Sequence, residues 1–306
     1  MKQDITTLWD LSEERIQYLF ARALELKKQH RENRRDLPLA GRSVGLMFDK
    51  PSTRTRVSFE AAMIQLGGVP MFISVKDTQI ARNEPVEDTS RVLSRYLDAL
   101  VVRTFSQKFM EDLAASADIP VINALTDLYH PCQILSDLLT VLEARGDLSG
   151  ARIAWIGDGN NVAHSWINAA AILGFNLTLA CPATHMPEGF ILEKARQEGR
   201  GDIRVVNDPA EAAEGAHVIY TDVWASMGQE SEQHQREKAF AGFTVDQRLV
   251  DLASPDVIVM HCLPAHRGEE ITHEVLEGER SVVWDQAENK LHMHKAILEA
   301  LVLTWR

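Results

Sequence analysis

The chain has 306 residues, of which 45% are hydrophobic and 25% charged, a globular composition that excludes disordered and collagen-like proteins. Acidic residues outnumber basic ones by 44 to 32, and the net charge of −12 disfavours a general binder of nucleic acids or anionic membranes. The three cysteines lie far apart and suit a reducing cytoplasm better than a disulfide framework. With neither an apolar leader nor a membrane-length apolar run, we expect an unexported, cytoplasmic protein.

The first half of the chain alternates short apolar runs with helical patterns. A helix is predicted at 12–29, where Ser12 stands at the N-cap. Strands are then expected at 44–48, 69–74, 99–103 and 121–124, and helices at 56–66, 86–96, 108–117 and 133–144. Such alternation favours a parallel α/β sheet.

A polar, glycine-containing break at 144–150 precedes a second series with the same rhythm. Its strands are expected at 152–156, 177–180, 203–206, 218–221, 257–261 and 282–285. We therefore predict an α/β protein with two domains, 1–147 and 148–306. Each would be a parallel sheet flanked by helices, and a closing helix at about 290–305 would pack back on the first domain. Ligands are expected beyond the carboxyl ends of the strands.

The segment Ser52-Thr53-Arg54-Thr55-Arg56 follows the first predicted strand and opens a helix. Hydroxyls, guanidinium groups and helix N-terminal amides together provide the charge and the donors that a phosphate dianion needs. An ordinary capped helix with solvated arginines would have the same residues. The position after a buried-type strand favours the phosphate site.

Three further polar residues stand close to predicted strand ends. Arg103 finishes a buried-type run and needs an anionic or carbonyl partner. His130 lies at a strand-to-helix turn, where it could donate to a polarised carbonyl, and Gln133 could bind an amide-sized group. A histidine in a turn is more often structural, so this interpretation requires His130 and Arg54 to face one crevice.

In the second half, the segment 155–163 resembles the beginning of a dinucleotide-binding fingerprint. The third glycine is missing, and Cys181-Pro182 stands where an acidic ribose ligand would be. We interpret this loop as a tight turn that places Asn161 near a substrate.

Two more segments follow strand ends in the second half. The loop from Asp222 through Ser226 to Gly228 could hold the ammonium and carboxylate groups of an amino acid, although an ordinary polar loop has similar residues. Cys262 could be a nucleophile, a polarisable contact or inert packing. We expect no metal, because the following histidines lack the spacing of a zinc site: His217, His234, His266, His292 and His294.

Four motifs in this order resemble the transcarbamoylase family over essentially the whole chain. They are Ser-Thr-Arg-Thr-Arg at 52–56, His-Pro-Cys-Gln at 130–133, Asp-Val-Trp-Ala-Ser-Met-Gly at 222–228 and His-Cys-Leu-Pro at 261–264. The last two resemble the ornithine-specific members rather than the aspartate-specific ones. The resemblance implies transfer of the carbamoyl group of carbamoyl phosphate to the δ-amine of L-ornithine, giving L-citrulline and phosphate, without an external cofactor and in arginine biosynthesis.

The resemblance also implies a role for each matched residue. Carbamoyl phosphate would be bound by Ser52, Thr53, Arg54, Thr55, Gln79, Arg103, His130, Gln133, Cys262, Leu263 and Lys290. Within this set Gln79 would reach into a neighbouring subunit's site. Ornithine would be bound by Asn161, Asp222, Ser226 and Met227, and the catalytic residues would be Arg103, His130, Asp222 and Cys262. The family assembles as homotrimers with the first domains at the centre.

One residue departs from the family pattern. The usual Glu-Asn-Arg before the last helix is here Glu288-Asn289-Lys290. Lysine keeps the charge but lacks the planar fork of arginine, so we predict a weaker affinity for carbamoyl phosphate.

Three alternatives stay open. The acceptor could be another amine, such as acetylornithine, putrescine or aspartate. The glycine turn at 157–163 would suit a nicotinamide-dependent oxidoreductase. The chain could also be a catalytically silent binding subunit.

Overall fold

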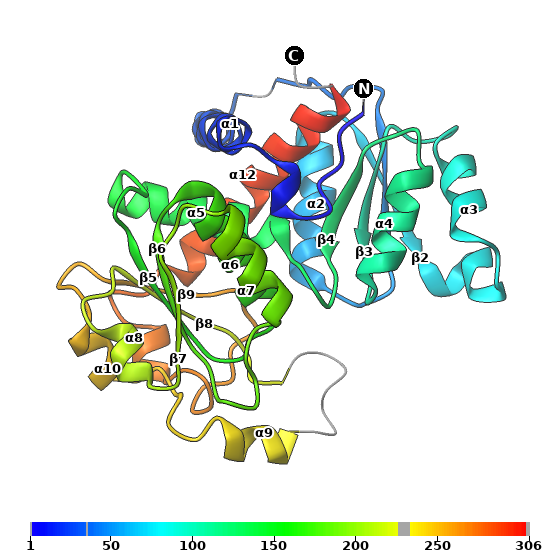
Figure 1. The fold of residues 1–306 in the computed structure, drawn as a ribbon. Coiled ribbons are helices and arrows are strands. Elements are labelled where there is room, and N and C mark those ends of the chain that lie inside the picture. Colours follow the sequence, from blue (N-terminus) through cyan, green and yellow to red (C-terminus); the bar gives the residue numbers. More distant parts are fainter. Residues whose placement is uncertain (1, 35, 226–232, 304–306) are drawn as a thin grey trace. The chain divides into compact units, whose positions relative to one another are not determined.

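The computed structural model describes residues 2–34, 36–225 and 233–303. The chain forms two compact units, one of Met1–Leu139 with Glu288–Arg306 and one of Thr140–Ala287. Two helices, α5 (Pro131–Arg145) and α12 (Val283–Val302), each begin in one unit and end in the other. The predicted class is confirmed, because both sheets are parallel and flanked by helices (Figure 1).

The sheet of the first unit has four strands in the order β2-β1-β3-β4. They are β1 (Ser43–Phe48), β2 (Val69–Ser74), β3 (Ala99–Arg103) and β4 (Val121–Leu125), joined by α2 (Thr53–Gln65), α3 (Val86–Leu93) and α4 (Gln107–Ser116). The central strands β1 and β3 are almost wholly buried, whereas edge strand β2 is partly exposed. Phe48 pairs with Arg103, so β1 and β3 end at the same level.

The C-terminal helix packs within the first unit between α1 (Glu13–Arg31) and α2. Arg22 of α1 pairs with Glu299 at 3.1 Å, and Lys27 donates to Asn289 at 2.7 Å. On the side of α2, the Ser58 hydroxyl and His294 Nδ1 are 2.9 Å apart. These contacts hold α12 against α1 and α2 in one core (Figure 1).

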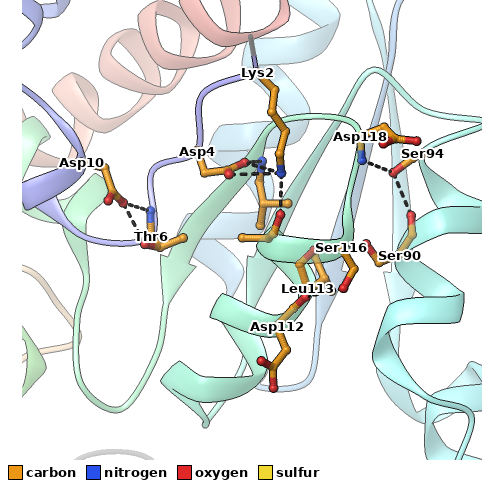
Figure 2. A network of polar contacts seen from close by, with 12 residues as sticks. Lys2, Asp4, Thr6, Asp10, Ser90, Ser94, Asp112, Leu113, Ser116 and Asp118 are labelled. Carbon is orange, nitrogen blue, oxygen red and sulfur yellow. Dashed lines mark hydrogen bonds and ion pairs between the residues drawn. The ribbon is translucent and has the colours of Figure 1, made fainter.

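The N-terminal segment extends the first sheet beyond β4. Ile5 donates its N–H to the Val121 carbonyl at 2.9 Å and accepts from Asn123 N–H at 2.7 Å. The Asp4 carboxylate accepts from Val121 N–H at 2.8 Å and pairs with Lys2 (Figure 2). Because an open sheet edge is a template for unwanted pairing, this segment protects β4.

The second unit contains five parallel strands in the order β7-β6-β5-β8-β9. They are β5 (Arg152–Ile156), β6 (Asn176–Ala180), β7 (Ile203–Val206), β8 (Val218–Thr221) and β9 (Ile258–His261). The helices within this unit are α6 (Asn161–Leu173), α7 (Gly189–Glu198), α8 (Pro209–Ala213), α9 (Gln233–Ala239), α10 (Gln247–Leu252) and α11 (His273–Leu276). The strand order reverses between β5 and β8, and such a switch point opens a crevice at the carboxyl ends.

Nine of the ten predicted strands match observed strands to within one residue at each end. The prediction at 282–285 is wrong, because Val283 begins α12, which therefore starts well before position 290. The apolar run is short, and such a run is ambiguous between strand and helix. It continues into the helix-forming residues from Gln286 onward. None of the described helices has the length and hydropathy needed to cross a membrane.

Candidate functional site

The predicted phosphate-binding segment lies at the N-terminus of α2, directly beyond β1. Ser52 is the N-cap, and its hydroxyl accepts from Thr55 N–H at 3.3 Å. Thr55 is buried, whereas Thr53 and Arg54 are exposed. The helix N-terminus and the Arg54 guanidinium thus place positive charge and hydrogen-bond donors at the end of a buried strand, which suits an anion.

Two further cations belong to the neighbouring strand ends. Asp49 N–H donates to the Arg103 carbonyl at 2.9 Å, and the Arg103 side chain is buried. Lys50 is buried too, pairs with Asp127 and lies 4.2 Å from the centre of the Phe105 ring. Lys50 was not predicted as a site residue, although it lies directly after β1, as Ser52 does.

His130 is 5% exposed and immediately precedes α5. Burial, together with the nearby charges of Lys290 and Arg103, holds the pKa of His130 well below its usual value of 6.5. The imidazole is therefore neutral at physiological pH and offers one N–H group. A neutral donor among cations suits a carbonyl oxygen that gains negative charge during a reaction.

Gln133 lies on the first turn of α5, and both polar atoms of its side-chain amide form hydrogen bonds. Its Nε2 donates to Asp137 Oδ1 at 2.8 Å, and its Oε1 accepts from Lys290 Nζ at 2.8 Å. All three side chains are buried. The structure thus brings the predicted residues Gln133 and Lys290 together, and Asp137 joins them as a residue that the sequence analysis missed.

In the second unit, Asp222 and Cys262 follow the adjacent strands β8 and β9. Cys262 Sγ donates to Asp222 Oδ1 at 3.0 Å, and Asn160 Nδ2 donates to Asp222 Oδ2 at 3.0 Å. Val223 N–H donates to Asp222 Oδ1 at 2.8 Å. The predicted residues Asp222 and Cys262 therefore lie together. Asp222 also contacts Asn160, the residue directly before the predicted Asn161 at the start of α6.

The buried His261 stabilises the turn at Cys262 through hydrogen bonds of both its ring nitrogens. His261 Nδ1 accepts from Leu263 N–H at 2.8 Å, and Nε2 lies 3.0 Å from Glu270 Oε1. Since Nδ1 is an acceptor, the proton is on Nε2 and is donated to Glu270. Leu263 has a φ of 58°, a left-handed conformation that a leucine adopts only where its surroundings impose it.

The glycine turn after β5 is filled by the protein itself. A Cβ on Gly159 would lie 2.3 Å from Pro187 N and 2.8 Å from the His185 carbonyl, so the 185–187 backbone requires a glycine there. The Asn160 side chain accepts from Val162 N–H and Ala163 N–H at the start of α6. A pyrophosphate needs those same amides, so this geometry disfavours the nicotinamide alternative.

One buried ion pair joins this turn to the loop after β8. Arg236 Nη1 donates to Asp158 Oδ2 at 2.8 Å and to the Trp224 carbonyl at 2.7 Å. Burial raises the pKa of Asp158 above its usual value, and the charge of Arg236 acts against that shift.

Ligand atoms of Asp222, His261 and Cys262 lie within 4.8 Å of one another, which is a spacing that metals can bridge. However, both ring nitrogens of His261 already have protein partners. A metal would have to break one of those bonds, so the cluster suits hydrogen bonding better than metal binding.

Three further predicted residues are Gln79, Ser226 and Met227. Gln79 lies in an exposed 3-10 segment, Gln79–Arg82, on the chain between β2 and α3. Ser226 and Met227 fall outside the described residues.

Comparison with known protein families matches both halves of the chain. The family model for the carbamoyl-P binding domain of aspartate/ornithine carbamoyltransferases covers residues 3–143, and the model for their Asp/Orn binding domain covers residues 149–301. The chain belongs to the aspartate/ornithine carbamoyltransferase family.

Relatives within this family are similar over their whole length. The ornithine carbamoyltransferase of Desulfotalea psychrophila is 56% identical over 299 residues, which are 98% of this chain and 99% of that protein. The enzyme of the same name from Halorhodospira halophila is 54% identical, with 97% of this chain and 98% of the relative covered.

Solved structures give the same result. The ornithine carbamoyltransferase of Pyrococcus furiosus has a TM-score of 0.95 and 45% identity, over 99% of this chain and 97% of that one. An anabolic ornithine carbamoyltransferase of Campylobacter jejuni has a TM-score of 0.93 and 38% identity over 100% of both chains.

Proposed function

We propose that this protein transfers the carbamoyl group of carbamoyl phosphate to the δ-amine of L-ornithine, forming L-citrulline and phosphate in arginine biosynthesis. The observation that carries the proposal is that relatives named ornithine carbamoyltransferase match it over at least 97% of its length at 50–56% identity. A cytoplasmic location accords with this role.

The proposal gives each group of residues a task. The domain of residues 1–147, with the C-terminal helix, binds carbamoyl phosphate, and the rest of the chain binds ornithine. The phosphate is held by Ser52, Thr53, Arg54 and Thr55, and by Gln79 of a neighbouring subunit. The carbamoyl group is held by Arg103, His130, Gln133, Cys262, Leu263 and Lys290. The amino-acid end of ornithine is held by Asn161, Asp222, Ser226 and Met227.

The chemistry needs positioning and charge stabilisation more than covalent catalysis. A neutral δ-amine attacks the carbonyl carbon, a tetrahedral oxyanion forms, and the C–O bond to phosphate then breaks. Thr55, Arg103 and neutral His130 donate to the oxyanion, and loss of one such donor costs about 3 kcal/mol of transition-state stabilisation. Arg54 stabilises the departing phosphate, whose oxygen takes the proton from the amine.

The δ-amine of ornithine is protonated in neutral water and must lose that proton before it attacks. The Asp222–Cys262 pair, 3.0 Å apart, supplies a carboxylate and a thiol for this step. Both groups sit at the carboxyl ends of strands, where ligands of such sheets bind.

A homotrimer is part of the proposal. Exposed apolar side chains gather on α2 and β2, with Ile64 64%, Val57 53% and Met71 49% exposed. Such a concentration of exposed apolar area is typical of a subunit interface. Analytical ultracentrifugation tests this point, because a monomer of 34.3 kDa and a trimer sediment at clearly different rates.

The deciding experiment measures ureido products from carbamoyl phosphate with ornithine, acetylornithine, putrescine and aspartate supplied separately. Citrulline as the sole product is the expected result. Product from another amine would keep the assignment of the phosphate site and overturn that of the Asp222 loop. No product from any amine would favour the binding-subunit alternative.

A further inference from the structure

The Gln133 amide lies between an ammonium group, which can only donate, and a carboxyl oxygen, which accepts from it. Lys290 Nζ donates to Gln133 Oε1 at 2.8 Å, and Gln133 Nε2 donates to Asp137 Oδ1 at 2.8 Å. Gln133 is 3% exposed, Lys290 6% and Asp137 0%. Asp137 follows Gln133 by one helical turn on α5, whereas Lys290 comes from α12.

These two neighbours determine which way the amide faces. The Lys290 ammonium has no acceptor, and Asp137 Oδ1 is the acceptor for Gln133 Nε2. If the amide rotated by 180°, its NH2 would face Lys290 and its oxygen would face Asp137, which would oppose donor to donor and acceptor to acceptor. Away from water such an arrangement loses both hydrogen bonds, one of them from the charged Lys290, so the orientation is strongly fixed.

In this fixed orientation, Gln133 Oε1 can accept one more hydrogen bond, from a ligand. A carbonyl oxygen has two lone pairs, and among the residues that the structure describes Lys290 is its one donor partner. The second lone pair can therefore accept from a ligand N–H group. A carbamoyl group carries an NH2 donor, whereas an acetyl group of similar size carries a methyl group in that place.

We propose that Asp137 is a positioning residue that keeps the Gln133 oxygen turned toward the ligand, and so makes the site select a carbamoyl over an acetyl group. The inference rests on the function proposed above and deepens it by naming the origin of substrate selection. Sites that hydrogen-bond a substrate NH discriminate strongly against analogues that lack it, because a buried partner is then left unsatisfied.

The test replaces Asp137 with asparagine, which has the same size but can present either an oxygen or an NH2 to Gln133. Binding of carbamoyl phosphate, acetyl phosphate and inorganic phosphate to the full-length protein is measured by calorimetry. We expect carbamoyl phosphate to bind about tenfold more weakly to D137N, while the affinities for acetyl phosphate and inorganic phosphate change less than about twofold. Glu143→Gln, the same acid-to-amide change on an exposed turn of α5, should change none of the three.

A second variant separates positioning from simple packing. Asp137→Glu is larger but keeps a carboxyl group as the partner of the Gln133 amide, so it should retain more of the preference for carbamoyl over acetyl phosphate than D137N does. If Asp137 only fills space, D137N should instead retain more of this preference than D137E, because asparagine fits the space better than glutamate. Should D137E fail to fold, the binding of the three ligands to D137N still distinguishes positioning from packing.

The proposal is overturned if D137N weakens the binding of all three ligands by the same factor, or if it leaves the preference for carbamoyl over acetyl phosphate unchanged. Its failure can be distinguished from failure of the proposed function. Citrulline formation by the unmodified protein tests the function, whereas the binding measurements contain no ornithine and test only the role of Asp137.

Discussion

The Cys262 thiol donates to Asp222 Oδ1 over 3.0 Å and joins the carboxyl ends of the neighbouring strands β8 and β9. The same carboxylate accepts from the Asn160 side chain at 3.0 Å and from Val223 N–H at 2.8 Å. Three donors from three segments therefore fix the carboxylate. The thiol is the member of this group that a small substitution can remove without loss of the other contacts.

Replacing Cys262 with alanine should lower kcat at least about tenfold and shift its pH profile. The reason is that Asp222 and Cys262 would no longer act together to favour the deprotonated δ-amine. The measurement is citrulline formation between pH 6 and pH 10, with ornithine saturating at each point. Cys181→Ala is the matched control, since Cys181 is buried in the same unit and follows β6. An unshifted profile in Cys262→Ala would rule out this role.

Replacing Lys290 with arginine should lower the KM for carbamoyl phosphate. Lysine reaches Gln133 with a single donor at 2.8 Å, whereas a guanidinium can bind two acceptors at once. Steady-state kinetics at saturating ornithine measure the change. Lys295→Arg, at another buried lysine of α12, should leave this KM unchanged, and an equal fall in both variants would contradict the prediction.

Much of the site could be predicted because parallel sheets gather their functional residues beyond strand ends. Arg103, Asp222 and Cys262 were all found by their place at or after an apolar run, and each lies at the carboxyl end of an observed strand. Such positions can be recognised from the local pattern of apolar and polar residues alone.

Contacts between distant segments could not be predicted in the same way. The bond from Asn160 to Asp222 requires β5 and β8 to be neighbours in the sheet, and the bond from Lys290 to Gln133 joins residues 157 positions apart. Periodicity gives the strands but not their order. The role of Asp137 was missed for the same reason, since an acidic residue on an apolar helix has meaning only once its partners are known.

Replacing Arg236 with glutamine should destabilise the protein by about 3 kcal/mol, because Asp158 is left buried without its counter-charge. The pair is nearly enclosed, with side chains 9% and 11% exposed. Urea unfolding measures the loss, and the double variant with Asp158→Asn should recover most of it. Arg204→Gln breaks the exposed pair with Glu211 and should cost less than about 1 kcal/mol.

The loss in Arg236→Gln should also depend on pH. Burial already raises the pKa of Asp158, and without Arg236 that pKa rises further. In the variant the unfolded state therefore ionises first as pH increases, so stability is lost as pH rises above the unfolded value near 4. The difference in unfolding free energy between the unmodified protein and Arg236→Gln should therefore become smaller as the pH is lowered toward about 4. A deficit that is the same at all pH values would mean that lost packing, not the buried charge, is its cause.

His292 should make the first unit sensitive to acid. Burial and the charge of Lys295 lower the pKa of His292 to about 4, whereas in the unfolded chain it is near 6.5. Because the unfolded state takes up the proton first, stability is fully present above pH 6.5 and is lost as pH falls toward 4. At pH 5 this linkage amounts to about 2 kcal/mol.

Replacing His292 with glutamine should therefore flatten the decline in unfolding free energy between pH 6.5 and pH 5, measured by urea unfolding at several pH values. Whatever the substitution costs at pH 7 is a separate packing effect and does not change the slope. His266→Gln, at an exposed histidine, should leave the slope as it is in the unmodified protein. An equally steep decline in His292→Gln would mean that other groups cause the acid sensitivity, with the buried and similarly shifted His130 and His294 the next to be replaced.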